Sequence, residues 1–456
     1  MEVVILAAGK GTRMNSSQPK VLHSIGGKAM LSHVLDTAQR LDPAAIHVVV
    51  GYGADTIKAH YNGRDINWVL QEQQLGTGHA VQQSIPHIEQ QHSDNTVLVL
   101  FGDVPLISQA TLEKLLGEAG SDKVALLSVI STAPDGFGRI VRDDSAAVQC
   151  IVEHKDASAG QRLINEVNTG IMALPAARLG DWLQRIDNSN KQQEYYLTDI
   201  IALAVADGLE VKAIQADNEL EVMGVNDKAQ LALLERHYQM LQTDQLLEAG
   251  VTLRDPARVD IRGELICGQD VEIDINVIFE GRVELADGVC IGANCVISNA
   301  SIGSNTAILP GCNIEETVIG SNASIGPVAR LRPGTRLADG VKIGNFVETK
   351  KAVIGPGSKA NHLAYIGDAE IGSACNIGAG TIFCNYDGAN KHKTVLGDNV
   401  FVGSNSVLIA PVNLADNSFV AAGSAINTDV AGDSLAVARA KQRNIPGWKR
   451  PVKSQS

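Results

Sequence analysis

Hydrophobic and polar positions follow two different patterns along the chain. Over residues 1–225, short apolar runs rich in β-branched residues alternate with stretches of helical spacing. The runs predicted as strands occupy residues 3–7, 46–50, 67–70, 96–101 and 124–130. Residues 30–41 and 78–88 are predicted helices between them. This alternation indicates an α/β Rossmann-like domain with a mostly parallel sheet.

A helical segment follows this domain. Residues 226–249 contain no Gly or Pro, their leucines recur near helical spacing, and Gly250 comes next as a helix-ending residue. We therefore expect three regions: a domain over 1–225, a linker helix over 226–250 and a second domain over 251–456.

The second domain carries a repeat in which an aliphatic residue returns every five or six positions. The repeat includes Ile291, Ile297, Ile302, Ile308, Ile314, Ile319, Ile325, Leu331, Leu337, Ile343, Ile354, Ala360, Ile366, Ile371, Ile377, Leu396, Val402, Leu408, Leu414, Val420 and Ile426. Hexapeptide repeats of this kind predict a parallel β-helix with three hexads in each coil. Residues 384–393 interrupt the spacing, so they are expected to form an outward loop.

Composition narrows the class of protein. The 44 Gly and 4% aromatic residues suit a Gly-rich β repeat, and the net charge of −13 argues against nucleic-acid binding. The seven Cys include no Cys-x-x-Cys pair, which favours reduced thiols. No window approaches the length of a membrane span. We expect a cytoplasmic protein.

A Gly-rich loop directly follows the first predicted strand. Gly9 and Gly11 allow backbone N–H groups to approach an anion, and Arg13 and Lys20 add positive charge. The loop matches neither the phosphate-binding loop of P-loop enzymes nor the dinucleotide fingerprint. A Gly-rich turn with surface cations is the alternative interpretation.

Other polar residues lie beside apolar runs in this half. Asp103 ends a strand after Gly102, where a carboxylate suits a Mg²⁺ that bridges phosphates, although it could equally cap a helix. Thr77, Glu153 and Asn168 have the chemistry to contact sugar hydroxyls, or to serve as turn and cap residues.

Spacing also groups polar residues in the repeat. Arg332 and Lys350 are one coil apart and should stack at the strand spacing, which favours a bound anion between them; the alternative is a solvated cationic ladder. Glu348 and Tyr365 are also one coil apart. His362 lies nearby and is the side chain best suited to accept a proton near pH 7, so we interpret it as a base rather than a surface His without a role. We expect Glu348 to orient it.

Together these motifs resemble known enzymes. "LAAGKGTRM", "LGTGHA", "GFGRI", "EHKDA" and "NTGI" are similar to sugar-1-phosphate nucleotidylyltransferases. "RLRPGT", "GNFVETKK", "KANHLAYIGDAEIG" and "CNYDGANK" narrow the resemblance to the bacterial bifunctional enzymes that join an N-acetylglucosamine-1-phosphate uridyltransferase to a glucosamine-1-phosphate N-acetyltransferase. The resemblance covers nearly the whole chain. It implies a left-handed β-helix and a product, UDP-N-acetylglucosamine, that feeds peptidoglycan and lipopolysaccharide synthesis.

For the first half, the resemblance implies a uridylyltransferase with a substrate site and a Mg²⁺ site. The nucleoside of UTP would contact Leu6, Ala7, Ala8, Gly9, Gln71 and Gly76. Arg13 and Lys20 would face the phosphates as catalytic residues. The rest of the substrate site would comprise Thr77, Phe101, Gly102, Gly138, Glu153 and Asn168. Asp103 and Asn226 would hold Mg²⁺. Phe101 is a departure, because the family commonly carries Tyr there.

For the second half, the resemblance implies an acetyltransferase that uses acetyl-CoA. His362 would be the base, and glucosamine-1-phosphate would contact Arg332, Lys350, Tyr365 and Asn376. The acetyl-CoA contacts would be Ala379, Asn385, Tyr386, Ser404, Ala422 and Arg439, with Lys391 as a further candidate. Homotrimers are expected. The alternatives are a single-activity nucleotidylyltransferase whose β-helix serves oligomerisation, and a non-catalytic assembly protein.

Overall fold

The computed structural model describes residues 1–89 and 95–453. It divides into two compact units, Met1–Tyr238 and Gln239–Ser456. Helix α7 (Lys228–Glu248) is continuous across this division. None of the helices in the described ranges combines the length and apolar character that a membrane crossing requires.

Unit 1 is built on one mixed sheet whose main path runs β11-β7-β10-β6-β1-β4-β5. The five predicted strands are present as β1 (Glu2–Ala7), β4 (Ala45–Val50), β5 (Asn67–Leu70), β6 (Thr96–Phe101) and β7 (Lys123–Ile130). Strands β1, β4, β5 and β6 are mutually parallel, and β11 (Glu210–Gln215) is parallel to β7.

The prediction of a mostly parallel sheet needs one correction. Strand β10 (Glu166–Pro175) runs antiparallel to both of its central neighbours, β6 and β7. It also pairs with β8 (Arg139–Arg142), which forms an antiparallel pair with β9 (Val148–Val152). Apolar spacing alone carries no strand direction, because both faces of a central strand are buried in either case.

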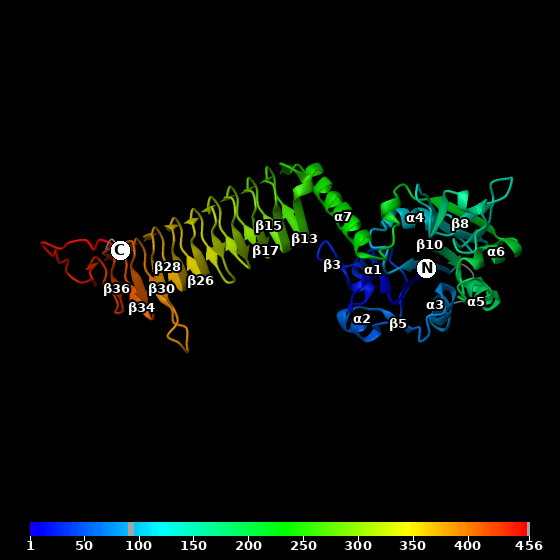
Figure 1. Ribbon diagram of the computed structural model, residues 1–456, viewed down its shortest axis with the longest axis horizontal. Helices are drawn as coiled ribbons and strands as arrows, with labels where there is room; N and C mark the ends of the chain where they lie inside the picture. The colour runs from blue at the N-terminus through cyan, green and yellow to red at the C-terminus, as the bar shows by residue number, and fades with distance from the viewer. Residues whose placement is uncertain (90–94, 454–456) are drawn as a thin grey trace. The chain divides into compact units, whose positions relative to one another are not determined.

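Helices cover both faces of this sheet (Figure 1). Because successive side chains of a strand point to opposite faces, β1 contributes Val3 and Ile5 to one core and Val4 and Leu6 to the other. The first core includes α1 (Met30–Arg40), α2 (Ala54–His60) and α4 (Gln109–Gly117). The second includes α3 (Thr77–Ser84), α5 (Ala176–Arg185) and α6 (Asp199–Ala206). The carboxyl ends of β1 and β6 therefore open between the two helix layers.

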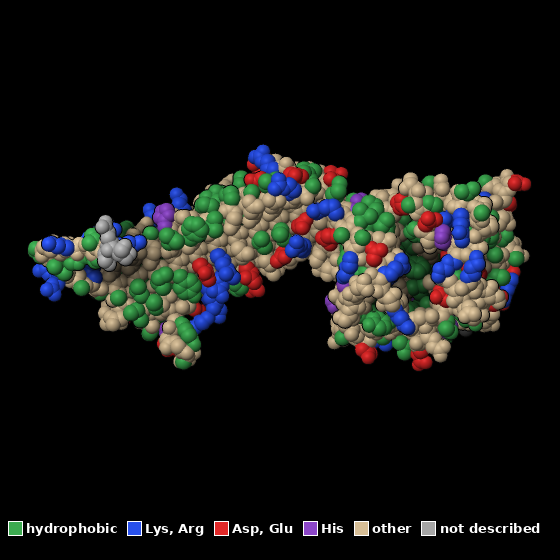
Figure 2. All heavy atoms as spheres, in the orientation of Figure 1, with side chains coloured by type: hydrophobic (Ala, Val, Ile, Leu, Met, Phe, Trp, Pro, Cys, Tyr) green, Lys and Arg blue, Asp and Glu red, His purple; other side chains and the backbone are tan. Residues whose placement is uncertain are grey.

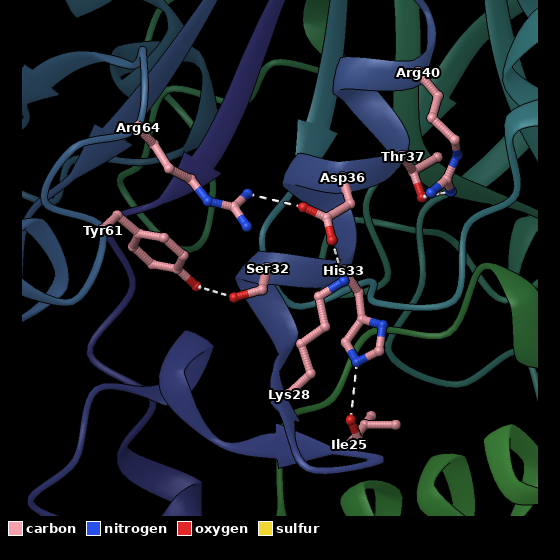
Figure 3. A network of polar contacts seen from close by, with 9 residues as sticks. All are labelled: Ile25, Lys28, Ser32, His33, Asp36, Thr37, Arg40, Tyr61 and Arg64. Atoms are coloured by element: carbon pink, nitrogen blue, oxygen red, sulfur yellow. Dashed lines mark hydrogen bonds and ion pairs between the residues drawn. The ribbon is translucent and has the colours of Figure 1, made fainter. Parts of the chain in front are cut away.

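Helix α1 is also held by polar contacts along its length (Figure 3). The Asp36 carboxylate accepts from Lys28 and, at 2.8 Å, from Nη1 of Arg64. The Ser32 and Tyr61 hydroxyls are 2.9 Å apart, and Nε2 of His33 lies 2.9 Å from the Ile25 carbonyl oxygen. Although burial opposes it, pairing with Lys28 and Arg64 lowers the pKa of Asp36. These contacts tie α1 to Ile25 and Lys28 before it and to Tyr61 and Arg64 after α2.

Unit 2 is a parallel β-helix, as the hexad repeat predicts. Its coils stack strand on strand through two sheets, one with the path β12-β14-β16-β19-β22-β25-β27-β29-β32-β35-β37 and one that supplies the other two faces. The pairings between these coils are parallel, and most join residues 17 or 18 apart, such as Ile291 with Ile308 and Ile325 with Ile343. The aliphatic residues of the repeat lie buried in one continuous core.

A second inward position lies two residues before each aliphatic residue. Small side chains fill it, among them the buried Thr306, Thr335, Ser358 and Thr381. Their hydroxyls donate to backbone carbonyls, for example Thr306 to Gly320 at 2.8 Å and Ser358 to Gly372 at 2.6 Å. These bonds satisfy polar groups that burial would otherwise leave unpaired.

The predicted loop projects from the β-helix between β30 (Ile382–Cys384) and β31 (Thr394–Leu396), in orange in Figure 1. It is held by its own hydrogen bonds. The Asp387 carboxylate accepts from the backbone N–H groups of Ala389 and Asn390 at 2.8 and 2.6 Å and lies 2.6 Å from Nε2 of His392. The coils on either side keep their register, since Ile377 still pairs with Val402.

Candidate active sites

The first candidate site is a pocket at the carboxyl ends of β1 and β6. It is open to solvent. The predicted residues that line it are Leu6, Ala7, Ala8, Gly9, Lys20, Gln71, Gly76, Thr77, Phe101 and Asp103. Ligands of open α/β sheets bind at this edge because the strand ends leave a crevice there.

Cationic and oxygen-bearing side chains converge at one end of this pocket. Nζ of Lys20 donates to Oδ2 of Asp103 and lies 3.4 Å from Oδ1 of Asn226. Nη2 of Arg13 donates to the same Asn226 oxygen at 2.9 Å. The structure thus brings together the four residues predicted for phosphates and Mg²⁺, although Asn226 lies just before α7, far along the chain.

The donor set here suits Mg²⁺. A carboxylate oxygen and an amide oxygen both face the single Lys20 amine, so they can reach one common point, and Mg²⁺ typically takes one or two such protein oxygens with water and phosphates. No group of three or more His, Cys, Asp or Glu side chains forms a metal site within the described ranges.

Three of the predicted sugar residues lie together beside this pocket. The backbone N–H of Asn168 donates to the Gly138 carbonyl at 2.9 Å. A Cβ atom on Gly138 would lie 2.9 Å from Cγ2 of Ile151 and 3.5 Å from Oε1 of Glu153, so Gly138 packs directly beside these two residues. Burial raises the pKa of Glu153, and the Thr198 hydroxyl donates to it at 2.9 Å. Oδ1 of Asn168 is buried with no hydrogen-bond partner, as expected of a group that waits for a ligand.

Sequence reasoning missed several residues of this region. Gln74 and Glu194 line the pocket, and Thr198 holds Glu153. The signal was weak, because these residues lie in polar stretches without a recognisable motif. Phe101 packs its ring over Gly170, where a Cβ atom would lie 2.5 Å from the ring.

The second candidate site lies on the β-helix. Strand β26 (Glu348–Ile354) pairs with β28 (Tyr365–Ile371), and Glu348 is directly opposite Tyr365, as the spacing predicts. Leu331 is opposite Thr349, so Arg332 and Lys350 follow in register. Figure 2 shows Lys and Arg side chains gathered on the β-helix near the projecting loop.

Lys391 adds a third cation from the loop. Its proximity, then burial and the charge of Arg332, lower the pKa of Lys350. The loop also brings Asn385 to the cluster, where its Nδ2 contacts Oδ2 of Asp368 and lies 3.5 Å from the Tyr365 hydroxyl. Gly367 leaves room for this arrangement, because a Cβ atom would lie 2.5 Å from that hydroxyl. Arg332 is paired with Glu348, but the neighbouring amines of Lys350 and Lys391 lie close together, which favours an anionic ligand such as a phosphate.

The prediction that Glu348 orients His362 is wrong. Oε1 of Glu348 accepts from Nη1 of Arg332 at 2.8 Å, whereas Nδ1 of His362 lies 2.9 Å from Oδ1 of Asn345. His362 ends β27 (Lys359–His362) on one sheet, and Glu348 begins β26 on another, so the chain turns a corner between their positions. Asn345 is one coil before His362 and could have been found by the same count that found Tyr365.

The predicted acetyl-CoA residues form a column along this corner. The backbone N–H of Asn405 donates to the Ala379 carbonyl at 2.7 Å, and that of Gly423 to the Ser404 carbonyl at 2.8 Å. A guanidinium N–H of Arg439 donates to the Ala422 carbonyl. His362 continues the column by one coil. The backbone N–H of Gly380, which follows Ala379, donates to the carbonyl of Leu363, which follows His362, at 2.9 Å.

Two predicted residues stand apart from these groups. Asn376, in β29 (Asn376–Ile377), pairs with Lys359 and Phe401 on a different sheet from Arg332 and Lys350. The exposed side chain of Tyr386 bonds within the loop, where its hydroxyl donates to the Gly388 carbonyl at 2.5 Å.

Comparison with known proteins agrees with both halves. Residues 3–166 match the MobA-like NTP transferase domain, and residues 393–428 match the hexapeptide repeat of succinyl-transferase. The chain is 54% identical over 453 residues to the bifunctional protein GlmU of Stutzerimonas stutzeri, with 99% of each chain covered. It is 55% identical over 456 residues to that of Aromatoleum aromaticum, which covers both chains fully. It is 56% identical over 454 residues to that of Marinobacter nauticus, with 100% of this chain and 99% of the relative covered.

This chain belongs to the bifunctional GlmU family. As a GlmU protein it is a transferase with uridyltransferase and acetyltransferase activities, and nothing favours a single activity or a non-catalytic assembly role.

Proposed function

We propose that the chain transfers the acetyl group of acetyl-CoA to glucosamine-1-phosphate in unit 2, and a uridylyl group from UTP to N-acetylglucosamine-1-phosphate in unit 1. The product, UDP-N-acetylglucosamine, supplies peptidoglycan and lipopolysaccharide synthesis. The observation that supports the proposal is the presence of two separate pairs of cationic side chains, Arg13 with Lys20 and Arg332 with Lys350.

For acetyl transfer, the sugar phosphate binds at Arg332, Lys350 and Lys391, with Tyr365 beside them. His362 takes a proton from the sugar ammonium group, and the neutral amine attacks the thioester carbonyl. The C–S bond breaks, and the thiolate of CoA leaves and is protonated. The column of Ala379, Ser404, Ala422 and Arg439 provides the groove for CoA.

For uridylyl transfer, the phosphate of N-acetylglucosamine-1-phosphate is itself the nucleophile. Its oxygen attacks the α-phosphorus of UTP, and pyrophosphate leaves, so unit 1 mainly aligns and neutralises the reactants. Lys20 and Arg13 bind and neutralise the phosphates, and Glu153 and Asn168 hold the sugar. Asp103 and Asn226 would hold Mg²⁺, which supplies charge stabilisation to the phosphates when bound.

Two assays on one preparation test the proposal. Glucosamine-1-phosphate with acetyl-CoA should release free thiol, and N-acetylglucosamine-1-phosphate with UTP and Mg²⁺ should release pyrophosphate. We expect His362→Ala to abolish only thiol release and Asp103→Ala to abolish only pyrophosphate release. Retention of thiol release by His362→Ala would contradict the mechanism, and absence of thiol release from the unmodified protein would contradict the acetyltransferase assignment.

We further propose that the chain forms a trimer through the β-helix. Val328, Phe346 and Leu363 occupy one exposed corner, each with a left-handed backbone at φ 55°, 56° and 44°. Bulky residues rarely adopt this conformation without a role, and these present an apolar ridge to solvent. Asn376 lies on another sheet from the Arg332–Lys350 pair, so a neighbouring copy would bring these groups into one site.

Sedimentation measurements test this assembly. The unmodified chain should sediment with three times the mass of one chain, and Phe346→Glu should yield monomers. Phe419→Glu, at a similarly exposed aromatic position on another part of the β-helix, is the matched control. A monomeric unmodified chain would contradict the trimer.

We place the reactions in the cytoplasm. All seven Cys are free thiols, as a reducing compartment favours.

A further inference from the structure

Asn345 contacts both His362 and the residue after it at one corner of the β-helix. They are directly opposite in the pairing of β25 (Lys342–Asn345) with β27. Nδ1 of His362 lies 2.9 Å from Oδ1 of Asn345. The backbone N–H of Leu363, the next residue, donates to the Asn345 carbonyl at 3.0 Å. Both the imidazole and the peptide after it are therefore anchored to the same residue.

The side-chain contact selects one form of the imidazole. An amide oxygen can only accept a hydrogen bond, so Nδ1 of His362 must carry the proton. In the neutral ring Nε2 then has the free lone pair. A base needs a lone pair in a fixed direction, and the left-handed residues Phe346 and Leu363 hold the backbone directly after Asn345 and His362.

The charged residues nearby are engaged elsewhere. Glu348 is paired with Arg332, and Lys350 faces Lys391 and Arg332. Across residues 1–89 and 95–453, no carboxylate lies within ion-pair distance of His362. The neutral amide of Asn345 is thus the group that orients the ring.

We propose that Asn345 is a positioning residue of the acetyl transfer, which holds His362 in the form that accepts the substrate proton at Nε2. This inference rests on the proposed function, in which His362 is the base. It also explains the place of His362 in the column: Ala379 is the next member, so the thioester end of the CoA groove and Nε2 meet at the same corner.

Variants of Asn345 test the proposal through rate and pH dependence. In Asn345→Ala the ring is free to rotate and to change tautomer, so kcat for thiol release should fall about 10- to 100-fold, a part of what a general base contributes. KM for both substrates should stay within about twofold.

Asn345→Asp supplies the conservative rescue. A carboxylate accepts the same proton from Nδ1, so the rate should recover at high pH. Its negative charge favours the protonated imidazole, so the acidic limb of the rate–pH profile should move up by about one pH unit. A merely structural role of Asn345 would not move this limb.

Two controls keep the outcomes distinct. Asn313→Ala, at an exposed position of β20 (Asn313–Glu315), should leave thiol release unchanged, and pyrophosphate release by every variant reports on folding of unit 1. An Asn345→Ala enzyme with unchanged kcat, or an Asn345→Asp enzyme with neither rescue nor a moved limb, would overturn the inference. An active His362→Ala enzyme would instead overturn the proposed function beneath it.

Discussion

Asp199 begins helix α6 among other carboxylates. Burial, followed by the charges of Glu153, Asp187 and Asp156, raises its pKa from 3.8 to about 6. The folded state therefore holds this proton over a pH range in which the unfolded chain has lost it. The stability from this group is fully present below pH 3.8 and is lost as pH rises through about 6.

We predict that Asp199→Asn removes this pH dependence. Relative to the unmodified chain, its free energy of unfolding should gain about 1 kcal/mol between pH 4.5 and 7.5, after allowance for solvent screening. Urea unfolding of unit 1 at the two pH values measures it. Asp144→Asn, on the exposed turn between β8 and β9, should show no such difference. An equal change in both variants would contradict the assignment.

At the scale of single residues, the sequence predicts which residues lie opposite each other better than it predicts which side chains form hydrogen bonds. Coil counting placed Tyr365 opposite Glu348, because register depends only on residue number along a regular strand. It did not predict that Asn345 rather than Glu348 contacts His362. The direction of a side chain at a corner depends on the backbone angles there, such as the left-handed conformations of Phe346 and Leu363. Bulky residue types like these do not predict a left-handed backbone.

Among the elements, α7 supports the unit 1 site through hydrogen bonds made near its first turn. Near its start, Oε1 of Gln230 accepts from the backbone N–H of Asn226 at 2.7 Å, and the backbone N–H of Gln230 donates to Oδ1 of Asp227 at 2.9 Å. The neighbouring Val225 N–H donates to the Asp103 carbonyl at 2.9 Å. The helix start therefore holds both proposed Mg²⁺ ligands in place.

We predict that Gln230→Met weakens the metal site while the helix persists. The Mg²⁺ concentration for half-maximal pyrophosphate release should rise about tenfold, as for other partners of metal ligands. Electron paramagnetic resonance of bound Mn²⁺ should show the same loss of affinity, and thiol release should not change. Gln245→Met, on an exposed part of α7, is the matched control. A Mg²⁺ titration like that of the unmodified chain would rule this role out.

Elements were predictable in proportion to the regularity of their spacing. The aliphatic hexad specified the β-helix, and the apolar runs specified β1, β4, β5, β6 and β7. Helix α3 ends at Ser84, before the predicted residue 88, because Pro86 lies in the short 3₁₀ turn that follows. Asn226 was assigned only through the resemblance, since no local pattern connects a helix start to a strand end so distant in the chain.

For the whole molecule, the two units have separate cores, so we expect them to unfold in separate thermal transitions. Leu408 is fully buried in the β-helix, whereas its neighbour Ile409 is 42% exposed. We predict that Leu408→Ala destabilises unit 2 by about 2–5 kcal/mol and leaves pyrophosphate release unchanged. Ile409→Ala should have a much smaller effect.

Calorimetry of the full chain distinguishes the outcomes. Only one of two unfolding transitions should move in Leu408→Ala, and it should be the one accompanied by loss of thiol release on heating. Equal shifts of both transitions would show that the units unfold together.

The coil spacing of the β-helix sets the distance between the two ends of one column of residues. The members of this column are His362, Ala379, Ser404, Ala422 and Arg439. Each member is one coil from the next, so the base and the last cation are four strand spacings apart, roughly 19 Å. The reach required of an acyl carrier is thereby set by a whole number of coils. Inserting or deleting one coil between His362 and Arg439 would change that reach by roughly 5 Å while every contact at either end stayed the same. In such a fold, the length of the acyl carrier that fits can change without a change in the residues that carry out acetyl transfer.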